Sequence, residues 1–140
     1  MICLVPTGCY RQVLSPVAGA RVELVVLILS APANLEERSR ARETWLRVSE
    51  DTRRSVKHLF VVGTEGLPSD IQKEVDRELT QHGDILALPL VDSYQALTEK
   101  VLQSLVQIWR NVNFNYVLKC DDDTFVDLVK LIAELRQALF

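Results

Sequence analysis

Residues 116–126 read YVLKCDDDTFV, and in them a short apolar strand runs directly into three consecutive aspartates. Carboxylates packed this closely repel one another unless a positive charge neutralises them. A divalent cation is the simplest such charge, and hard carboxylate oxygens suit Mg²⁺, Ca²⁺ or Mn²⁺. The structural alternative is a solvated acidic loop that caps the next helix. The position after a strand favours a ligand site, because α/β sheets bind ligands beyond the carboxyl ends of their strands.

The stretches before and after this one predict the sheet to which the strand belongs. We expect strands at residues 22–29, 56–62, 84–88 and 115–120. A helix is expected after each strand: one that begins behind Asn34 and carries Trp45, and others at residues 69–82, 94–110 and 127–139.

This alternation predicts an α/β fold, with a parallel sheet, right-handed crossovers and helices on both faces. The nearly continuous apolar strands agree, since parallel strands are covered on both sides. The carboxyl ends of the strands should then meet at one edge of the sheet. The residues expected at that edge are Ser30, Gly63, Asp92 and Asp121.

Several residues carry signals for helix ends. Asn34 with Glu37, and Ser69 with Gln72, have the spacing of capping boxes. Gly83 is expected to end the helix of residues 69–82. The stripe expected to face inward on the helix of residues 94–110 is Leu97, Val101, Leu105 and Ile108.

Composition limits the class of protein. The chain has 140 residues, of which 48% are hydrophobic and 25% charged, with a formal net charge of −3. This is enough for one domain with a core, and the mild acidity argues against a nucleic-acid partner. No apolar stretch reaches the length of about 20 residues that a membrane-spanning helix needs. The three cysteines, Cys3, Cys9 and Cys120, indicate no disulfide framework.

Other acidic motifs fit the triplet less well. An EF-hand loop counted from Asp121 would need Gly where Val126 stands and Glu where Ile132 stands. Haloacid-dehalogenase-like phosphatases place their aspartate pair after the first strand, whereas this triplet follows the fourth. What remains is a metal-diphosphate site, in which two carboxylates separated by one residue hold a cation and orient its ligands.

Five groups of residues occur in the order typical of one enzyme family. They are Arg38 and Arg42 ahead of TW at 44–45, FVVG at 60–63, GDI at 83–85, DSY at 92–94 with Leu97, Thr98 and Lys100, and KCDDDTF at 119–125. In these groups the chain resembles the β-1,3-galactosyltransferase family, glycosyltransferase family 31, over residues 22–140. Shorter stretches, such as VGTEGL at 62–67 and AELR at 133–136, are similar to the branch that builds the linkage region of proteoglycans.

The resemblance implies a GT-A-like (Rossmann-like) fold in truncated form. Residues 1–20 would be a loosely ordered leader, and residues 21–140 the nucleotide-sugar-binding half of a glycosyltransferase domain. The resemblance also implies UDP-galactose as donor, Mn²⁺ as cofactor, and a galactosyl-xylose acceptor on a proteoglycan. It further implies a lumenal site at the Golgi membrane, through an anchor that this chain lacks.

For the site, we expect Asp121 and Asp123 to bind the metal and Asp121 and Asp122 to contribute to the donor site. Asp122 has an alternative role as a capping or supporting residue. The other expected donor-binding residues are Ser30, Arg38, Arg42, Asp92 and Lys119.

Structural alternatives stay open for several of these residues. Ser30 could close a turn, and Asp92 could cap the helix that follows it. Arg38 and Arg42 share one helix face, where they could reach the donor diphosphate or pair with neighbouring glutamates, Glu37 and Glu43, on a solvated surface.

The chain departs from the family pattern in two places that matter for activity. Ala96 stands where the family usually has Asn, which removes a polar group near the donor. The general base is expected beyond Phe140, so no catalytic residue is predicted within the chain. A shortened, inactive form of the same lineage and a metal-dependent phosphatase-like hydrolase are therefore left open.

Overall fold

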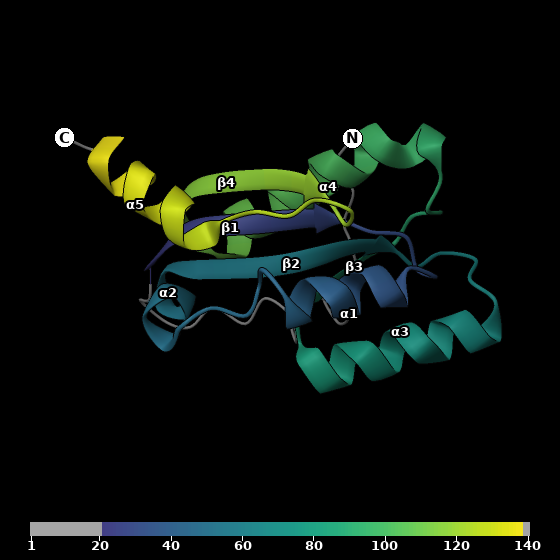
Figure 1. Ribbon diagram of the computed structural model, residues 1–140. Helices are drawn as coiled ribbons and strands as arrows, with labels where there is room; N and C mark the ends of the chain where they lie inside the picture. The colour runs from purple at the N-terminus through teal and green to yellow at the C-terminus, as the bar shows by residue number, and fades with distance from the viewer. Residues whose placement is uncertain (1–20, 139–140) are drawn as a thin grey trace.

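The computed structural model describes residues 21–138. The predicted leader, residues 1–20, lies outside the described residues. Four parallel strands form one sheet: β1 (Arg21–Leu29), β2 (Val56–Gly63), β3 (Ile85–Leu88) and β4 (Asn113–Asp121), as Figure 1 shows. The predicted parallel α/β sheet is confirmed. Within the described residues no helix combines the length and the apolarity needed to span a membrane.

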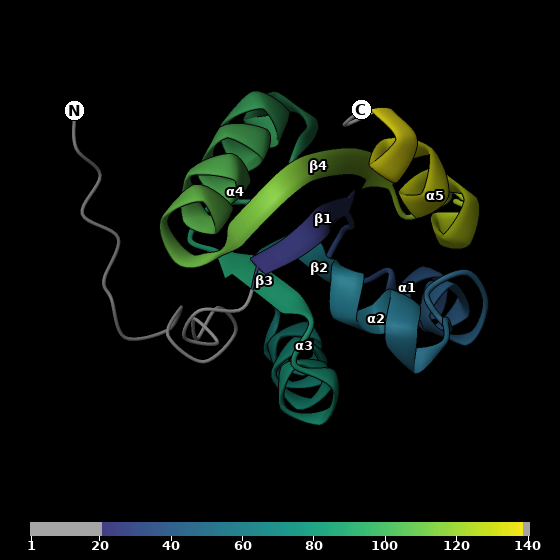
Figure 2. The same cartoon turned by 90° about the vertical axis from the view of Figure 1, so that its left-hand side faces the viewer.

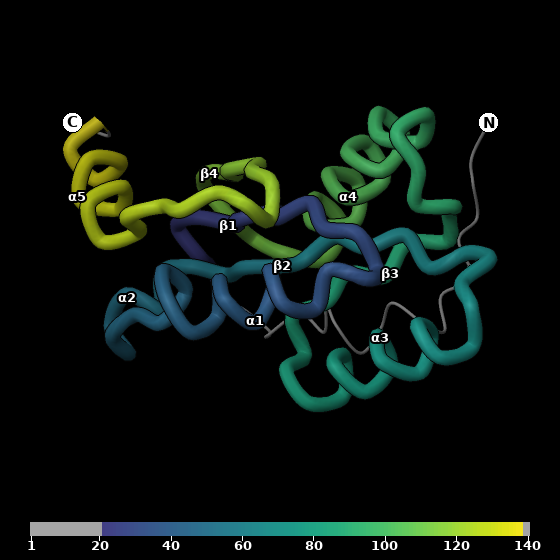
Figure 3. The backbone as a smooth tube through the Cα atoms, turned by 45° about the vertical axis from the view of Figure 1, so that its right-hand side comes forward, coloured from purple at the N-terminus to yellow at the C-terminus, as the bar shows by residue number. Residues whose placement is uncertain are grey.

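The strand order in the sheet is β3-β2-β1-β4. The chain therefore steps from β1 to β2 to β3 in one direction and then returns to the other side of β1 as β4, a path that Figure 3 traces. Leu29 at the end of β1 pairs with Val61 of β2 and with Asp121 of β4. The order reverses between β1 and β4, and open α/β sheets bind ligands at such a switch point.

Helices cover both faces of the sheet (Figure 2). The helical segments are α1 (Leu35–Glu43), α2 (Glu50–Ser55), α3 (Ser69–His82), the 3₁₀ turn η1 (Tyr94–Ala96), α4 (Leu97–Asn111) and α5 (Leu128–Ala138). The crossover from β3 to β4 runs through α4 on one face, whereas α1, α3 and α5 pack on the opposite face.

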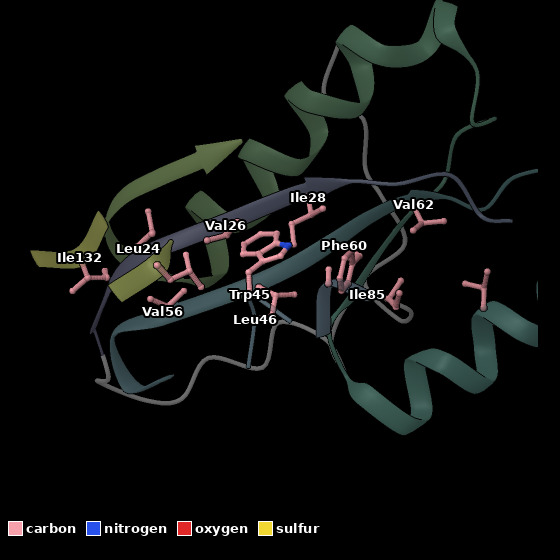
Figure 4. Packing of buried hydrophobic residues seen from close by; sticks show 13 residues of the cluster. Leu24, Val26, Ile28, Trp45, Leu46, Val56, Phe60, Val62, Ile85 and Ile132 are labelled. Carbon is pink, nitrogen blue, oxygen red and sulfur yellow. The ribbon is translucent and has the colours of Figure 1, made fainter. Parts of the chain in front are cut away.

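The core has two layers because β1 and β2 are buried on both sides. Alternate residues of β1, with Leu24 as an example, face α1, α3 and α5, and the residues between them, such as Val25, face α4. Figure 4 shows the first layer, where Trp45 lies over Val26 and Ile28. At β4 burial alternates along the strand, so the continuous apolar pattern predicted for parallel strands holds for the central strands and not for this edge.

Several local predictions are wrong in detail. Asn34 precedes α1, but its side chain makes no capping hydrogen bond. The residue before α3 is Pro68, and Ser69 is already helical. Trp45 lies beyond the end of α1, and the short helix α2, capped by Ser49, was not predicted. The expected C-terminal cap at Gly83 is confirmed, with φ +66° and its N–H bonded to the carbonyl of Leu79.

The inward face of α4 is also different from the predicted one. Leu97 and Leu105 are partly exposed, whereas Ile108 is fully buried as expected. The other buried residues of this helix are polar: Lys100, Ser104 and Gln107. The face of α4 that packs on the sheet is therefore more polar than the predicted stripe. One of its polar residues, Lys100, reaches the edge of the sheet where the strands end.

Candidate functional site

The middle aspartate of the triplet is tied to the end of the first strand. Its Oδ2 accepts hydrogen bonds from Ser30 Oγ at 2.8 Å and from Asn34 Nδ2 at 3.0 Å. The backbone N–H of Asp122 donates to the carbonyl of Leu29 at 3.1 Å. The loops after β1 and β4 are thus joined at the switch point. Asn34, which the sequence suggested only as a helix cap, is a member of this site.

The outer aspartates have different surroundings from Asp122. Asp121 and Asp123 are exposed to solvent, whereas Asp122 is half-buried. Asp121 is the last residue of β4 and pairs with Leu29 in the parallel register. Asp123 lines a hollow of about 280 Å³ beside α1, together with Arg40 and other residues. Two carboxylates at the carboxyl edge therefore remain open to a ligand.

The residues fit a cation only in part. Across residues 21–138, no group of three or more His, Cys, Asp or Glu side chains converges on a common point. Ions such as Mg²⁺ are commonly held by one or two carboxylates, with phosphate oxygens of a substrate and water completing the shell. The exposed carboxylates of Asp121 and Asp123 suit this kind of site rather than a closed protein cage.

Arg38 is buried beneath the loop that follows β1, with only 1% of its surface exposed. Its Nη1 donates to Ser30 Oγ at 3.0 Å and to the carbonyl of Ala31 at 2.6 Å. Its Nη2 donates to the carbonyl of Pro32, and both Nε and Nη2 donate to Glu78 at 2.7 Å. The five N–H groups of a guanidinium are thereby all engaged within the protein. In this structure Arg38 shapes the β1 loop.

Arg42 points away from the triplet. It makes a bidentate pair with Asp84 at 2.9 and 2.7 Å, contacts Glu78 at 2.7 Å, and lies over the ring of Phe60. The alternative in which Arg38 and Arg42 pair with neighbouring glutamates on a solvated surface is wrong, since their partners are Glu78 of α3 and Asp84, the residue before β3. A donor-binding role for either arginine stays a prediction.

The acidic partners of these arginines are strongly ionised. Burial alone would raise the pKa of Asp84, but hydrogen bonds and charges from Arg42 and His58 outweigh it and hold that pKa well below its ordinary range. Glu78 follows the same rule: burial raises its pKa, and the hydrogen bonds and charges of Arg38 and Arg42 lower it below the usual value. This chain of charges fixes α1 against α3 and the sheet.

Asp92 lies near the ends of β1 and β2, as predicted. Its Oδ2 accepts from the N–H of Gly63 at 2.8 Å and from Lys100 Nζ at 2.9 Å. Lys100 also donates to the carbonyl of Ser30 at 2.8 Å. The expectation that Ser30, Gly63, Asp92 and Asp121 gather at one edge is therefore confirmed.

Lys119 is exposed on β4, two residues before Asp121 and on the same side of the strand. Its position, paired with Leu27 of β1, leaves its ammonium free of the buried networks around Ser30 and Arg42. Two larger hollows, of about 380 and 390 Å³, lie around Arg42 and His82, and neither is lined by a residue of the triplet. The polar side chains that gather at the switch point thus mark the best candidate site.

Comparison with known proteins finds similarity to galactosyltransferases. The family model described as Galactosyltransferase matches residues 36–140. β-1,3-Galactosyltransferase 6 of Mus musculus is 42% identical over 119 residues, which cover 84% of this chain and 37% of that protein. β-1,3-Galactosyltransferase 4 of Canis lupus familiaris is 36% identical over 122 residues, covering 84% of this chain and 32% of that protein.

A plant relative shows how far the similarity extends. Hydroxyproline O-galactosyltransferase GALT5 of Arabidopsis thaliana is 32% identical over 116 residues, which cover 83% of this chain and 17% of that protein. The chain spans about a third or less of the length of these curated relatives. The part that the family model matches includes the carboxyl ends of β2, β3 and β4 and the whole aspartate triplet.

Proposed function

The chain belongs to the β-1,3-galactosyltransferase family, glycosyltransferase family 31, and on that premise we propose that it binds UDP-galactose with Mn²⁺ at the β1–β4 switch point. The observation that carries the proposal is the junction of Ser30 with Asp122, which sets Asp121 and Asp123 open beside the joined strand ends. Family membership favours this reading over a phosphatase-like hydrolase.

The proposed roles follow from the surroundings of each residue. Asp123 and Asp121 would hold the cation, which when bound supplies positive charge to the diphosphate of the donor. Asp122 holds the triplet against the β1 loop through Ser30 and Asn34. Lys119, exposed and close in sequence to Asp121, would add a further positive charge at the same edge.

The transfer reaction and its acceptor are the finer part of the proposal. We propose transfer of galactose in β-1,3 linkage to a galactosyl-xylose acceptor of a proteoglycan, at the Golgi lumen. The support is the identity with β-1,3-galactosyltransferase 6, together with the short stretches that resemble the linkage-region branch. Ala96 lies in the turn before α4, at a position where the family usually has Asn. Selection of the sugar is therefore tested separately from binding of the nucleotide.

Calorimetry with UDP in the presence and absence of Mn²⁺ tests the donor site. We expect Mn²⁺ to increase the affinity for UDP and Asp123→Asn to remove that increase. Loss of a residue that only supports a metal ligand costs about 10–100-fold in metal affinity, so loss of a ligand should cost at least as much. Glu134→Gln, an exposed change of equal charge on α5, is the matched control.

Competition between UDP-galactose, UDP-glucose and UDP-N-acetylglucosamine then tests the sugar. Stronger binding of UDP-galactose is expected from the family.

Undiminished Mn²⁺-dependent binding in Asp123→Asn would remove this aspartate from the site. Equal affinity for the three sugar nucleotides would remove sugar selection from this chain, and a transfer assay with a galactosyl-xyloside acceptor tests the reaction itself.

A further inference from the structure

Lys100 is an unusual residue for the buried face of a helix. Only 4% of its surface is exposed, although lysine is almost never fully buried unless it is paired. It lies one turn into α4, and its Nζ reaches the edge of the sheet, where it donates to the carbonyl of Ser30 and to Oδ2 of Asp92. The charge is therefore directed at the end of β1.

The carboxylate that pairs with Lys100 closes the end of the neighbouring strand. The same Oδ2 of Asp92 accepts from the N–H of Gly63, the last residue of β2. The chain around Asp92 lies directly against Gly63, because a Cβ there would stand 2.9 Å from the carbonyl oxygen of Leu90 and 3.0 Å from the Cβ of Asp92. Lys100 and Asp92 thus join the ends of β1 and β2 with the segment after β3.

Ser30 is held from both faces of the sheet. Lys100, from α4 on one face, binds its carbonyl oxygen, and Arg38, from α1 on the other face, donates to its hydroxyl. The hydroxyl in turn donates to Asp122. The position of the Asp122 carboxylate therefore depends on a residue whose backbone is fixed by Lys100.

We propose that Lys100 and Asp92 are a positioning pair for the nucleotide site, which fix Ser30 and, through it, the aspartate triplet. This inference rests on the proposed function, since the ligand is the metal–nucleoside diphosphate assigned to that site. A buried ion pair gives little net stability compared with apolar residues of similar volume. Its contribution here is the placement of the Ser30 carbonyl and of the Gly63 N–H.

The key variant is the double substitution Lys100→Met with Asp92→Asn. Lys100→Met alone leaves the partly buried Asp92 without its cation and should destabilise the fold, whereas changing both partners removes the uncompensated charge. We expect the double variant to recover most of the melting temperature lost in Lys100→Met. We also expect it to keep a loss of about tenfold or more in Mn²⁺-dependent UDP affinity, the range found for residues that orient metal ligands.

Amide hydrogen exchange supplies a readout that needs no nucleotide. The N–H of Ser30 donates to Val61 and that of Asp122 donates to Leu29. Both should exchange faster in the double variant, while Lys130→Met, an exposed change on α5, should leave them unchanged. A double variant with wild-type UDP affinity and wild-type exchange at these amides would overturn the inference. Absence of Mn²⁺-dependent binding in the wild-type chain would instead refute the proposed function and the ligand role with it.

Discussion

The hydroxyl of Ser30 donates a 2.8 Å hydrogen bond to Asp122, a residue 92 positions later in the chain. This contact closes the switch point of the sheet, where the strand order reverses between β1 and β4. It also separates the roles of three adjacent aspartates, because Asp122 is directed at the β1 loop while Asp121 and Asp123 are exposed. The consequences can be measured one residue at a time.

Alanine substitution should distinguish the aspartates by their effect on stability. Asp122→Ala leaves Ser30 Oγ and Asn34 Nδ2 without their acceptor, which should lower the free energy of unfolding by about 1–3 kcal/mol. Asp121→Ala and Asp123→Ala remove exposed groups and should stay within about 0.5 kcal/mol of the wild type. Urea unfolding measures all three. Equal losses in the three variants would contradict the assignment.

The pH dependence of stability should report the buried pair of Asp84 and Arg42. The pKa of Asp84 is depressed in the folded state, whereas the unfolded value is about 3.9. The unfolded chain therefore binds more protons in acid. The stabilisation is fully present above about pH 4 and is lost as the pH falls toward the folded pKa.

The variant Asp84→Asn tests this directly. It should lose about 3 kcal/mol of stability at neutral pH, because it leaves Arg42 without one of its two buried carboxylate partners. Its stability should also fall less steeply than that of the wild type as the pH drops below about 4. Asp70→Asn, an exposed change in the first turn of α3, is the control and should keep the wild-type profile.

Substitution of glycines by asparagine should change stability by different amounts. The cost depends on whether the space around the glycine or its backbone conformation restricts the position. Gly66 and Gly83 have φ of +71° and +66°, with no atom within 4 Å of an added Cβ, and asparagine tolerates that region. At Gly63 an added Cβ would lie 2.7 Å from Leu90 Cδ1 and 2.9 Å from the Leu90 carbonyl oxygen.

Gly63→Asn should therefore cost about 1–3 kcal/mol through overpacking, and more than Gly66→Asn or Gly83→Asn. Thermal unfolding of the three variants makes the comparison. Because the displaced segment carries Asp92, the Gly63 variant should also weaken Mn²⁺-dependent UDP binding. A Gly63 variant as stable as the other two would show that the 90–92 segment moves aside without cost.

The two tryptophans should give opposite fluorescence signals. Trp45 is 6% exposed and packs in the core layer that contains Val26 and Ile28, whereas Trp109, on α4, is 80% exposed. Trp109→Phe should leave a blue-shifted emission that acrylamide quenches poorly, and Trp45→Phe should leave a red-shifted emission that is quenched readily. Similar quenching in both variants would be inconsistent with this placement.

The fold could be predicted from the sequence to a large extent because its signals are local. Apolar strands alternating with amphipathic helices demand parallel pairing, and parallel pairing places all carboxyl ends at one edge. The gathering of Ser30, Gly63, Asp92 and Asp121 followed from this rule. The short helix α2 was missed because its six residues are polar, none is buried, and they carry no apolar period.

The partners of the charged residues could not be predicted in the same way. Arg38 meets Glu78 across 40 positions, Arg42 meets Asp84 across 42, and Lys100 meets Ser30 across 70. Each pair joins separate elements, so its geometry depends on how a helix lies on the sheet and not on neighbours in sequence. Asn34 shows the same limit, since its position before α1 suggested a cap, yet its side chain binds Asp122.

The sequence by itself therefore determined how strands and helices alternate along the chain. It also determined the edge at which the strands end and the acidic triplet at the end of β4. The tertiary structure alone decided that Asp122 faces the β1 loop, that Arg38 and Arg42 are buried in ion pairs, and that α4 turns Lys100 inward. The physical reason is the range of the interactions. Periodicity and turn chemistry act over a few residues, whereas a buried polar group must find a partner wherever the packed chain provides one.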